Sequence, residues 1–188
     1  WRDLSVDIVV ESTGFFTDGS KAKAHLNAGA KRVVITAPAK GEDVTTALVG
    51  VNDDRFLQPH PITCNASCTT NSVAPVIAIL LESLGIQKAS MVTIHGYTAT
   101  QSLVDGPTRG RDVRRGRAAA LNIVPSSTGA AIAVTRAIPE LEGKFDGIAL
   151  RVPVVTGSVA DITFVAKRKT SVEEINDILT KAAALPRW

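Results

Sequence analysis

A reactive thiol is the first chemistry that this sequence suggests. Cys68 lies between small hydroxyl residues in the segment Ser67–Asn71, directly before the apolar segment Ser72–Leu84. We predict a buried helix for the apolar segment, because it is hydrophobic on nearly every face and is followed by Gly85. Cys68 would then lie at the N-terminus of a helix, where free backbone N–H groups and the helix dipole favour a negatively charged sulfur. Such a sulfur is a nucleophile.

A base for this nucleophile is available in the strand-like segment Ala89–Gln101, which contains His95. A helix leading away from Cys68 and a strand leading back would bring the two side chains together. Each residue alone has a more ordinary interpretation, because a single cysteine or histidine in an apolar segment is more often part of the core. Three other side chains lack comparable neighbours and are interpreted as structural or surface residues: Cys64, His25 and His60.

Five segments follow one another along the chain: Asp7–Gly14, Asn65–Asn71, His95–Gln101, Arg117–Ala130 and Gly147–Pro153. Together they resemble the phosphorylating glyceraldehyde-3-phosphate dehydrogenases, and the resemblance runs from about Val6 to about Leu179. It implies NAD(P)-dependent oxidation of D-glyceraldehyde 3-phosphate to 1,3-bisphosphoglycerate in glycolysis or its reverse. Cys68 would form a thiohemiacetal and then a thioester, with His95 as the base.

The resemblance also implies two phosphate subsites. Thr98, Arg114 and Arg151 would bind the phosphate of the triose substrate. Inorganic phosphate would be bound by four residues that offer hydroxyl or backbone N–H groups: Ser67, Thr69, Thr128 and Gly129. The sequence itself supports an anion site at Gly129, because this residue precedes an apolar helix that is predicted to end at Ile138. A helix cap alone is an alternative interpretation of this position.

A basic segment, Gln101–Pro125, corresponds to the S-loop of the family and is long for an irregular loop. The stretch Asp105–Asp112 within it is one residue longer than the family pattern, which leaves open whether Arg114 or Arg115 binds phosphate. Pro153–Gly157 also departs from that pattern. The formal net charge of the whole chain is only +3, so the positive charge of the loop is local and suits phosphate. The loop carries five arginines: Arg109, Arg111, Arg114, Arg115 and Arg117.

The cofactor that the resemblance implies is NAD or NADP, and the choice between them stays open. Three residues are expected to contact its ribose and nicotinamide end: Thr13, Gly14 and Thr36. They follow predicted parallel strands, at the carboxyl ends where ligands bind in such sheets. A simple turn is an alternative interpretation of these positions. No metal site is expected, because no histidine or carboxylate partners follow Cys64 and Cys68 closely enough to complete one.

The order of the expected elements divides the chain into two parts. In residues 1–67, strands Val6–Glu11, Arg32–Thr36 and Thr46–Val51 alternate with the helix Ser20–Asn27. This α/β order predicts the C-terminal part of a Rossmann-like NAD(P)-binding domain. Residues 68–188 would form an α+β catalytic domain, truncated at its C-terminus, in which helices pack against a mostly antiparallel sheet. Its expected strands are Ser90–Tyr97, Gly147–Val155 and Ser158–Ala166.

The composition fits a globular protein, because 45% of the 188 residues are hydrophobic. No apolar segment reaches the roughly 20 residues that span a bilayer, and two cysteines are too few for a disulfide framework. We therefore expect a cytoplasmic protein. The chain enters a strand-like segment, Leu4–Val10, almost at its start and lacks the Gly-x-Gly phosphate loop of the family. We expect a middle fragment that is inactive alone.

Two other functions fit parts of the sequence. A related dehydrogenase acting on erythrose 4-phosphate would share the pair of Cys68 and His95, although the residues expected to bind inorganic phosphate favour glyceraldehyde 3-phosphate. A non-catalytic remnant that binds RNA through its S-loop arginines would show strongly salt-dependent binding and an ordinary thiol. The resemblance implies a homotetramer, and neither a membrane nor a nucleic-acid partner is expected.

Overall fold

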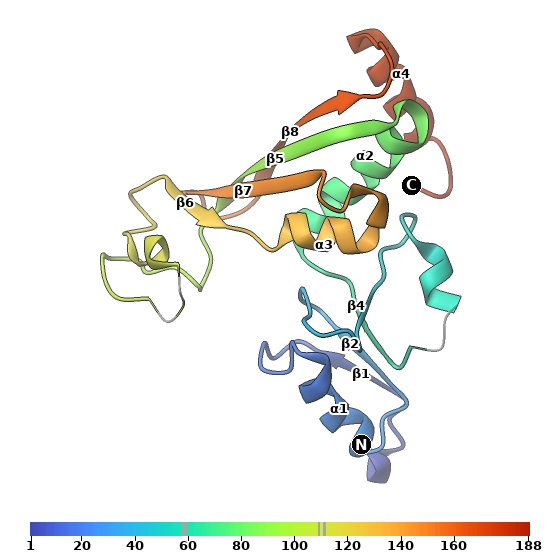
Figure 1. Ribbon diagram of the computed structural model, residues 1–188. Helices are drawn as coiled ribbons and strands as arrows, with labels where there is room; N and C mark the ends of the chain where they lie inside the picture. Colours follow the sequence, from blue (N-terminus) through green and yellow to red (C-terminus); the bar gives the residue numbers. More distant parts are fainter. Residues whose placement is uncertain (58–59, 109, 111) are drawn as a thin grey trace.

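The computed structural model describes residues 1–57, 60–108, 110 and 112–188. Within these residues the chain forms two four-stranded sheets, with helix α1 packed against the first and helices α2 and α3 against the second (Figure 1). Arg109 and Arg111 of the basic loop lie outside the described residues. We find no helix in the described part of the chain with the length and apolar character that crossing a membrane requires.

The first sheet has the strand order β1-β2-β4-β3, and every described pairing in it is parallel. Helix α1, whose N-cap is Asp18, packs against one face, where Val33, Ile35 and Ile62 are buried. The strands and the helix expected in this region are confirmed, apart from the length of β3. The bounds are β1 (Ile8–Glu11), α1 (Gly19–Asn27), β2 (Arg32–Ile35), β3 (Thr45–Thr46) and β4 (Ile62–Cys64).

The second sheet has the strand order β6-β7-β5-β8. Strand β5 pairs antiparallel with β8 but parallel with β7, and β6 pairs antiparallel with β7. The expected antiparallel character therefore holds for two of the three described pairings, and the sheet is partly parallel. The connection from β5 to β7 contains a helix and is long enough for the crossover that parallel neighbours need. The bounds are β5 (Ile86–Gly96), β6 (Val124–Ser127), β7 (Phe145–Val152) and β8 (Ser158–Ala166).

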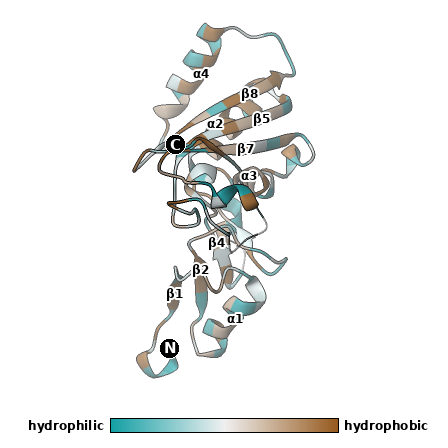
Figure 2. Ribbon diagram, turned by 90° about the vertical axis from the view of Figure 1, so that its left-hand side faces the viewer, coloured by the Kyte–Doolittle hydropathy of each residue, from teal (hydrophilic) through white to brown (hydrophobic). Residues whose placement is uncertain are grey.

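Helices α2 and α3 pack against each other and against the same face of the second sheet, and α4 packs on α2 (Figure 1). Their contact buries a continuous apolar core that includes Ile77, Met91 and Val134. Figure 2 shows hydrophobic and hydrophilic residues alternating around α4, as expected for a helix packed on one side. The bounds are α2 (Cys68–Leu84), α3 (Ala130–Ala137) and α4 (Val172–Ala183), with short 3-10 turns at Arg2–Leu4, Asp53–Leu57, Val113–Gly116 and Pro139–Leu141.

Two side chains join the parts of the chain that carry the two sheets. Asn52 accepts a hydrogen bond from the N–H of Leu48 (2.8 Å) and donates to the carbonyls of Thr46 (3.0 Å) and Ala137 (3.3 Å). The prediction of a strand over Thr46–Val51 is wrong beyond Thr46. The side chain of Asn52 pairs with the carbonyl of Thr46 and the N–H of Leu48, which a longer strand would pair with its neighbour. Arg136 of α3 donates to the carbonyl of Ala39 (2.6 Å).

Replacing Asn52 by alanine is expected to lower the free energy of unfolding by about 2 kcal/mol, because it leaves buried backbone groups unpaired. Urea unfolding followed by circular dichroism measures the change. Asn176→Ala, at an exposed position of α4, is the matched control and should change stability by less than about 0.5 kcal/mol. Equal stabilities of the two variants would contradict the bridging role of Asn52.

Candidate active site

Cys68 is the first residue of α2, and its side chain is exposed. Ser67 is the N-cap of the helix, since its Oγ accepts a hydrogen bond from the N–H of Thr70 (3.1 Å). The Ser67 hydroxyl also lies 2.8 Å from the Thr70 hydroxyl. The predicted position of Cys68 at a helix N-terminus is therefore confirmed, and the helix begins four residues earlier than its apolar segment.

The turn before Cys68 has a backbone conformation that the sequence does not signal. Ala66 has φ +60°, in the left-handed region that an alanine adopts at a cost of roughly 1 kcal/mol. The side-chain amide of Asn71 holds this turn, donating to the carbonyls of Asn65 (2.6 Å) and Ser67 (2.9 Å). Neither the conformation of Ala66 nor the hydrogen bonds of Asn71 were predicted from the sequence. An asparagine in the first turn of a helix is nevertheless a recognisable signal of side-chain hydrogen bonds to the backbone. Ala66 and Asn71 together fix the path of the chain between β4 and Cys68.

His95 is the last residue but one of strand β5. It lies beside Cys68, with 3.5 Å between Cys68 Sγ and His95 Nε2. Nδ1 lies 2.7 Å from the backbone carbonyl of Gly96, which can only accept a hydrogen bond, and 3.0 Å from Nη1 of Arg151, which can only donate. When the proton of the neutral ring is on Nδ1, Nε2 directs its lone pair toward the sulfur. This is the arrangement that a general base for a thiol requires.

Arg151 lies opposite His95 in the register of β5 and β7. Its Nη1 is 3.0 Å from His95 Nδ1 and donates to the Gly96 carbonyl (3.2 Å). Burial lowers the pKa of Arg151, and the nearby charge of Arg115 lowers it further, whereas the Cys68 sulfur raises it. Its buried Nε has no hydrogen-bond partner among the described residues. A half-buried cation of this kind favours an anionic ligand.

The structure separates the two arginines that the sequence left open. Arg115 donates to the Thr100 hydroxyl (2.8 Å) and the Ser127 carbonyl (3.1 Å), and its charge acts on Arg151. Arg114 instead forms two hydrogen bonds with the carboxylate of Asp112, at 2.7 and 2.9 Å. Arg115 therefore lies toward Arg151, whereas Arg114 is paired within the loop.

The other predicted phosphate ligands lie on three elements near these arginines. The Thr98 hydroxyl is 3.0 Å from the Thr100 hydroxyl that Arg115 contacts. Thr128 accepts a hydrogen bond from the N–H of Ala130 (3.1 Å), and Gly129 is the N-cap of α3. Thr69 is buried in the first turn of α2. These residues offer hydroxyl groups and the N-termini of two helices, which are groups that suit phosphate.

The three predicted cofactor residues follow the carboxyl ends of neighbouring parallel strands. The register places Glu11, Ile35 and Cys64, which are the last residues of β1, β2 and β4, in one row. The Thr36 hydroxyl donates to the Ser12 hydroxyl (2.9 Å). Thr13, Gly14 and the segment leading to Cys68 therefore leave the sheet at the same edge, where open parallel sheets bind ligands.

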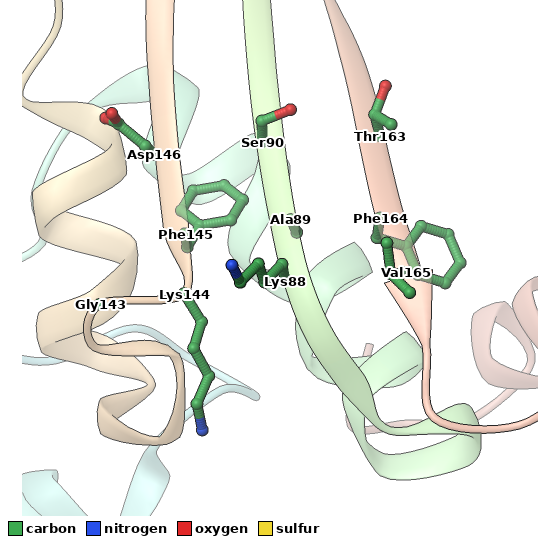
Figure 3. A pocket seen from close by; sticks show the side chains of 10 residues that line it. All are labelled: Lys88, Ala89, Ser90, Gly143, Lys144, Phe145, Asp146, Thr163, Phe164 and Val165. Atoms are coloured by element: carbon green, nitrogen blue, oxygen red, sulfur yellow. The ribbon is translucent and has the colours of Figure 1, made fainter.

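Figure 3 shows a pocket at the other end of the second sheet, where the side chains of Lys88, Phe145 and Phe164 lie around it. Ser90 also lines this pocket and is separated from His95 by about 16 Å along β5, at about 3.3 Å per residue. The pocket is therefore distinct from the candidate site. Among the described residues, no group of three or more His, Cys, Asp or Glu side chains is placed to bind a metal.

Asp112→Asn is expected to loosen the S-loop at neutral pH. Hydrogen bonds from Arg114 and from the Ser127 N–H hold the pKa of Asp112 well below its usual value. A carboxylate with a lowered pKa in the folded state contributes stability above pH 4, and this stability is lost as the pH falls further. The variant should melt a few degrees lower at pH 7, and the difference should shrink below pH 4. A difference that stays constant over this range would contradict the assignment.

The chain is similar to known proteins along most of its length. Residues 67–186 match the family model for the C-terminal domain of glyceraldehyde 3-phosphate dehydrogenase. The chain is 56% identical to the glyceraldehyde-3-phosphate dehydrogenase of Mycolicibacterium smegmatis over 99% of its own length and 54% of the relative. The corresponding enzyme 1 of Streptomyces avermitilis is 53% identical over 98% of the chain and 54% of the relative. The chain thus spans about half the length of the curated relatives it matches. It belongs to the glyceraldehyde-3-phosphate dehydrogenase family.

Proposed function

We propose that the full-length protein carrying this chain oxidises D-glyceraldehyde 3-phosphate to 1,3-bisphosphoglycerate, with NAD or NADP and inorganic phosphate, as a step of glycolysis or its reverse. The observation that carries this proposal is the contact of 3.5 Å between Cys68 and His95 beside the cationic Arg151. Residues 1–67 would belong to the dinucleotide-binding domain, as the C-terminal part of its Rossmann-like fold, and residues 68–188 to the catalytic domain. The chain alone would be inactive.

In the proposed reaction, the Cys68 sulfur adds to the aldehyde carbon after His95 takes the thiol proton. His95 returns that proton to the aldehyde oxygen, which gives the thiohemiacetal hydroxyl, and removes it again as hydride leaves, which yields a thioester on Cys68. Inorganic phosphate attacks the thioester, and the thiolate of Cys68 leaves. Arg151 stabilises the negative charge that develops in the transition states of these steps.

The dinucleotide supplies the hydride acceptor when it is bound. Thr13, Gly14 and Thr36 are proposed to hold its ribose and nicotinamide end. Their position at the carboxyl edge of a parallel sheet supports this role. Gly14 has φ +79° and no heavy atom within 4 Å of the position that a Cβ would occupy, so the backbone there is open to a ligand.

For phosphate binding we assign to Arg115 the role that the resemblance gave to Arg114. Arg115 lies close enough to Arg151 to lower the pKa of Arg151. Arg114 instead donates from Nε and Nη2 to the carboxylate of Asp112. Thr98 and Arg151 are proposed to hold the phosphate of the triose. The inorganic phosphate would lie near four further residues: Ser67, Thr69, Thr128 and Gly129.

Steady-state kinetics of the full-length protein test this function. Turnover of glyceraldehyde 3-phosphate should require inorganic phosphate and exceed turnover of erythrose 4-phosphate. Arg115→Lys should raise the KM for glyceraldehyde 3-phosphate at least about tenfold, because lysine cannot replace a forked guanidinium. Arg114→Lys is the matched control and should change that KM by less than about threefold. Phosphate-independent oxidation, or a larger effect at Arg114, would overturn these assignments.

A homotetramer in the cytoplasm is part of the same proposal. The face of the second sheet that points away from α2 and α3 carries exposed apolar side chains, among them Ile148, Val159 and Val165. An apolar sheet face of this kind is typical of a surface that pairs with another subunit. The proposal includes neither a membrane nor a nucleic acid as a partner.

A further inference from the structure

Glu11 is a buried carboxylate that the proposed reaction does not use. It ends β1, and its side chain is only 2% exposed. Its Oε1 accepts hydrogen bonds from the backbone N–H of Thr13 (2.7 Å) and from the Thr13 hydroxyl. Its Oε2 lies 2.7 Å from Nε2 of His25. Three donors thus converge on one carboxylate, which offsets the cost of burying its charge.

The orientation of His25 shows that it donates to this carboxylate. The indole N–H of Trp1 lies 3.1 Å from His25 Nδ1, and an indole nitrogen can only donate. Nδ1 therefore accepts, and the proton of the neutral ring is on Nε2, facing Glu11. Phe16 packs against the His25 ring, with 5.0 Å between ring centroids. Glu11 consequently accepts all three of its side-chain hydrogen bonds, two from Thr13 and one from His25.

Hydrogen bonding keeps Glu11 ionised despite its burial. Burial alone raises the pKa of the carboxyl group, but the hydrogen bonds from Thr13 and His25 outweigh it and lower the pKa below its usual value. The strand pattern explains the burial, because Glu11 occupies the same face of β1 as the buried Val9.

The turn after Glu11 is shaped by these contacts. The Thr13 hydroxyl, which donates to Glu11, also accepts a hydrogen bond from the N–H of Phe15 (3.1 Å). The carbonyl of Glu11 accepts from the N–H of Thr36 (3.0 Å), at the end of the neighbouring strand. Glu11 therefore holds Thr13 with its side chain and Thr36 with its main chain.

We propose that Glu11 is a positioning residue for the dinucleotide, whose buried carboxylate fixes the turn of residues 12–14 in the conformation that receives the cofactor. The inference rests on the proposed function, since Thr13, Gly14 and Thr36 are the residues assigned to the cofactor there. A carboxylate suits this position because its two oxygens can accept all three hydrogen bonds at once. A glutamine would turn its NH₂ group against a donor in either orientation.

The test measures the Kd of NAD and of NADP by calorimetry, together with kcat and KM, for variants of the full-length protein. Glu11→Gln should raise the Kd and the KM of the dinucleotide about tenfold and change kcat at saturation by less than about twofold. Asp7→Asn is the matched control, because it makes the same chemical change at an exposed ion pair with Lys31. Its constants should stay within about twofold of the wild type.

Substitutions of His25 provide a second arm that leaves Glu11 in place. His25→Gln keeps an N–H donor toward Glu11 and an acceptor for Trp1, so its dinucleotide affinity should match the wild type. His25→Leu removes the donor and should weaken binding. Amide hydrogen exchange at Thr13 gives a readout without any cofactor. Exchange should accelerate in Glu11→Gln but not in Asp7→Asn.

The outcomes separate this inference from the function on which it rests. If the wild type binds a dinucleotide and Glu11→Gln binds it equally well, the positioning role is wrong and the proposed function stands. If His25→Gln and His25→Leu bind equally, the hydrogen bond to Glu11 has no such role either. If the wild type binds neither NAD nor NADP, both the function and the inference are overturned.

Discussion

Replacing Cys68 by serine is expected to lower kcat/KM for glyceraldehyde 3-phosphate by about 10,000-fold in the full-length protein. A serine hydroxyl beside His95 is a far weaker nucleophile than a thiolate, and an oxygen ester is a poorer acyl donor than a thioester. Steady-state assays with NAD and with NADP measure the loss. Circular dichroism should show an unchanged fold, because the Cys68 side chain is exposed.

Cys64 is the matched control for this substitution. It is buried at the end of β4, and its sulfur lies 3.5 Å from the Thr46 hydroxyl. Cys64→Ser should retain kcat within about threefold, and iodoacetamide should modify Cys68 well before Cys64 near neutral pH. If both thiols react at the same rate, or if Cys68→Ser keeps more than about a tenth of the activity, Cys68 is not the nucleophile.

The pairing of Cys68 and His95 could be predicted because it depends on regular elements. An apolar segment of helical length ends at Gly85, and the next strand has the alternation that places His95 on the same face as the buried Thr93. Strand β8 has the predicted bounds, Ser158–Ala166. Local patterns of this kind carry their own geometry.

The choice between Arg114 and Arg115 could not be predicted, because both lie in a loop without a repeating pattern. The structure places them in a 3-10 turn, Val113–Gly116, where consecutive side chains point about 120° apart. A shift of one residue in the alignment therefore moves a guanidinium from the site to the carboxylate of Asp112. The parallel pairing of β5 with β7 was missed for a similar reason, since strand order depends on how a long connection crosses the sheet.

The burial of Glu11 follows from the strand that the sequence predicts. In the strand ending at Glu11, the period of two places its side chain on the same face as Val9, and a buried acid requires partners. The partner His25 is on the helix that follows, at a distance along the chain that no motif marks. The sequence left open whether His25 is a structural or a surface residue, and its contact with Glu11 agrees with a structural role.

His95→Asn is expected to lower kcat by about 100-fold to 10,000-fold while changing the KM of the aldehyde by only a few fold. Asparagine can still donate a hydrogen bond toward the Gly96 carbonyl, but it cannot take a proton from the thiol or from the thiohemiacetal. The hydroxyl proton of the thiohemiacetal, which must be lost when hydride is transferred, would pass to water instead. Hydride transfer should then limit turnover, and the primary isotope effect with C1-deuterated substrate should rise.

The alkylation rate of Cys68 separates the two proton transfers assigned to His95. If Nε2 takes the thiol proton across the 3.5 Å contact, His95→Asn should slow alkylation at neutral pH as well as turnover. If alkylation keeps its rate while kcat falls and the isotope effect rises, His95 acts only in the hydride step and the arginine charge alone activates the sulfur. Unchanged alkylation together with unchanged kcat would remove His95 from the mechanism, because its place beside Cys68 would then have no chemical consequence.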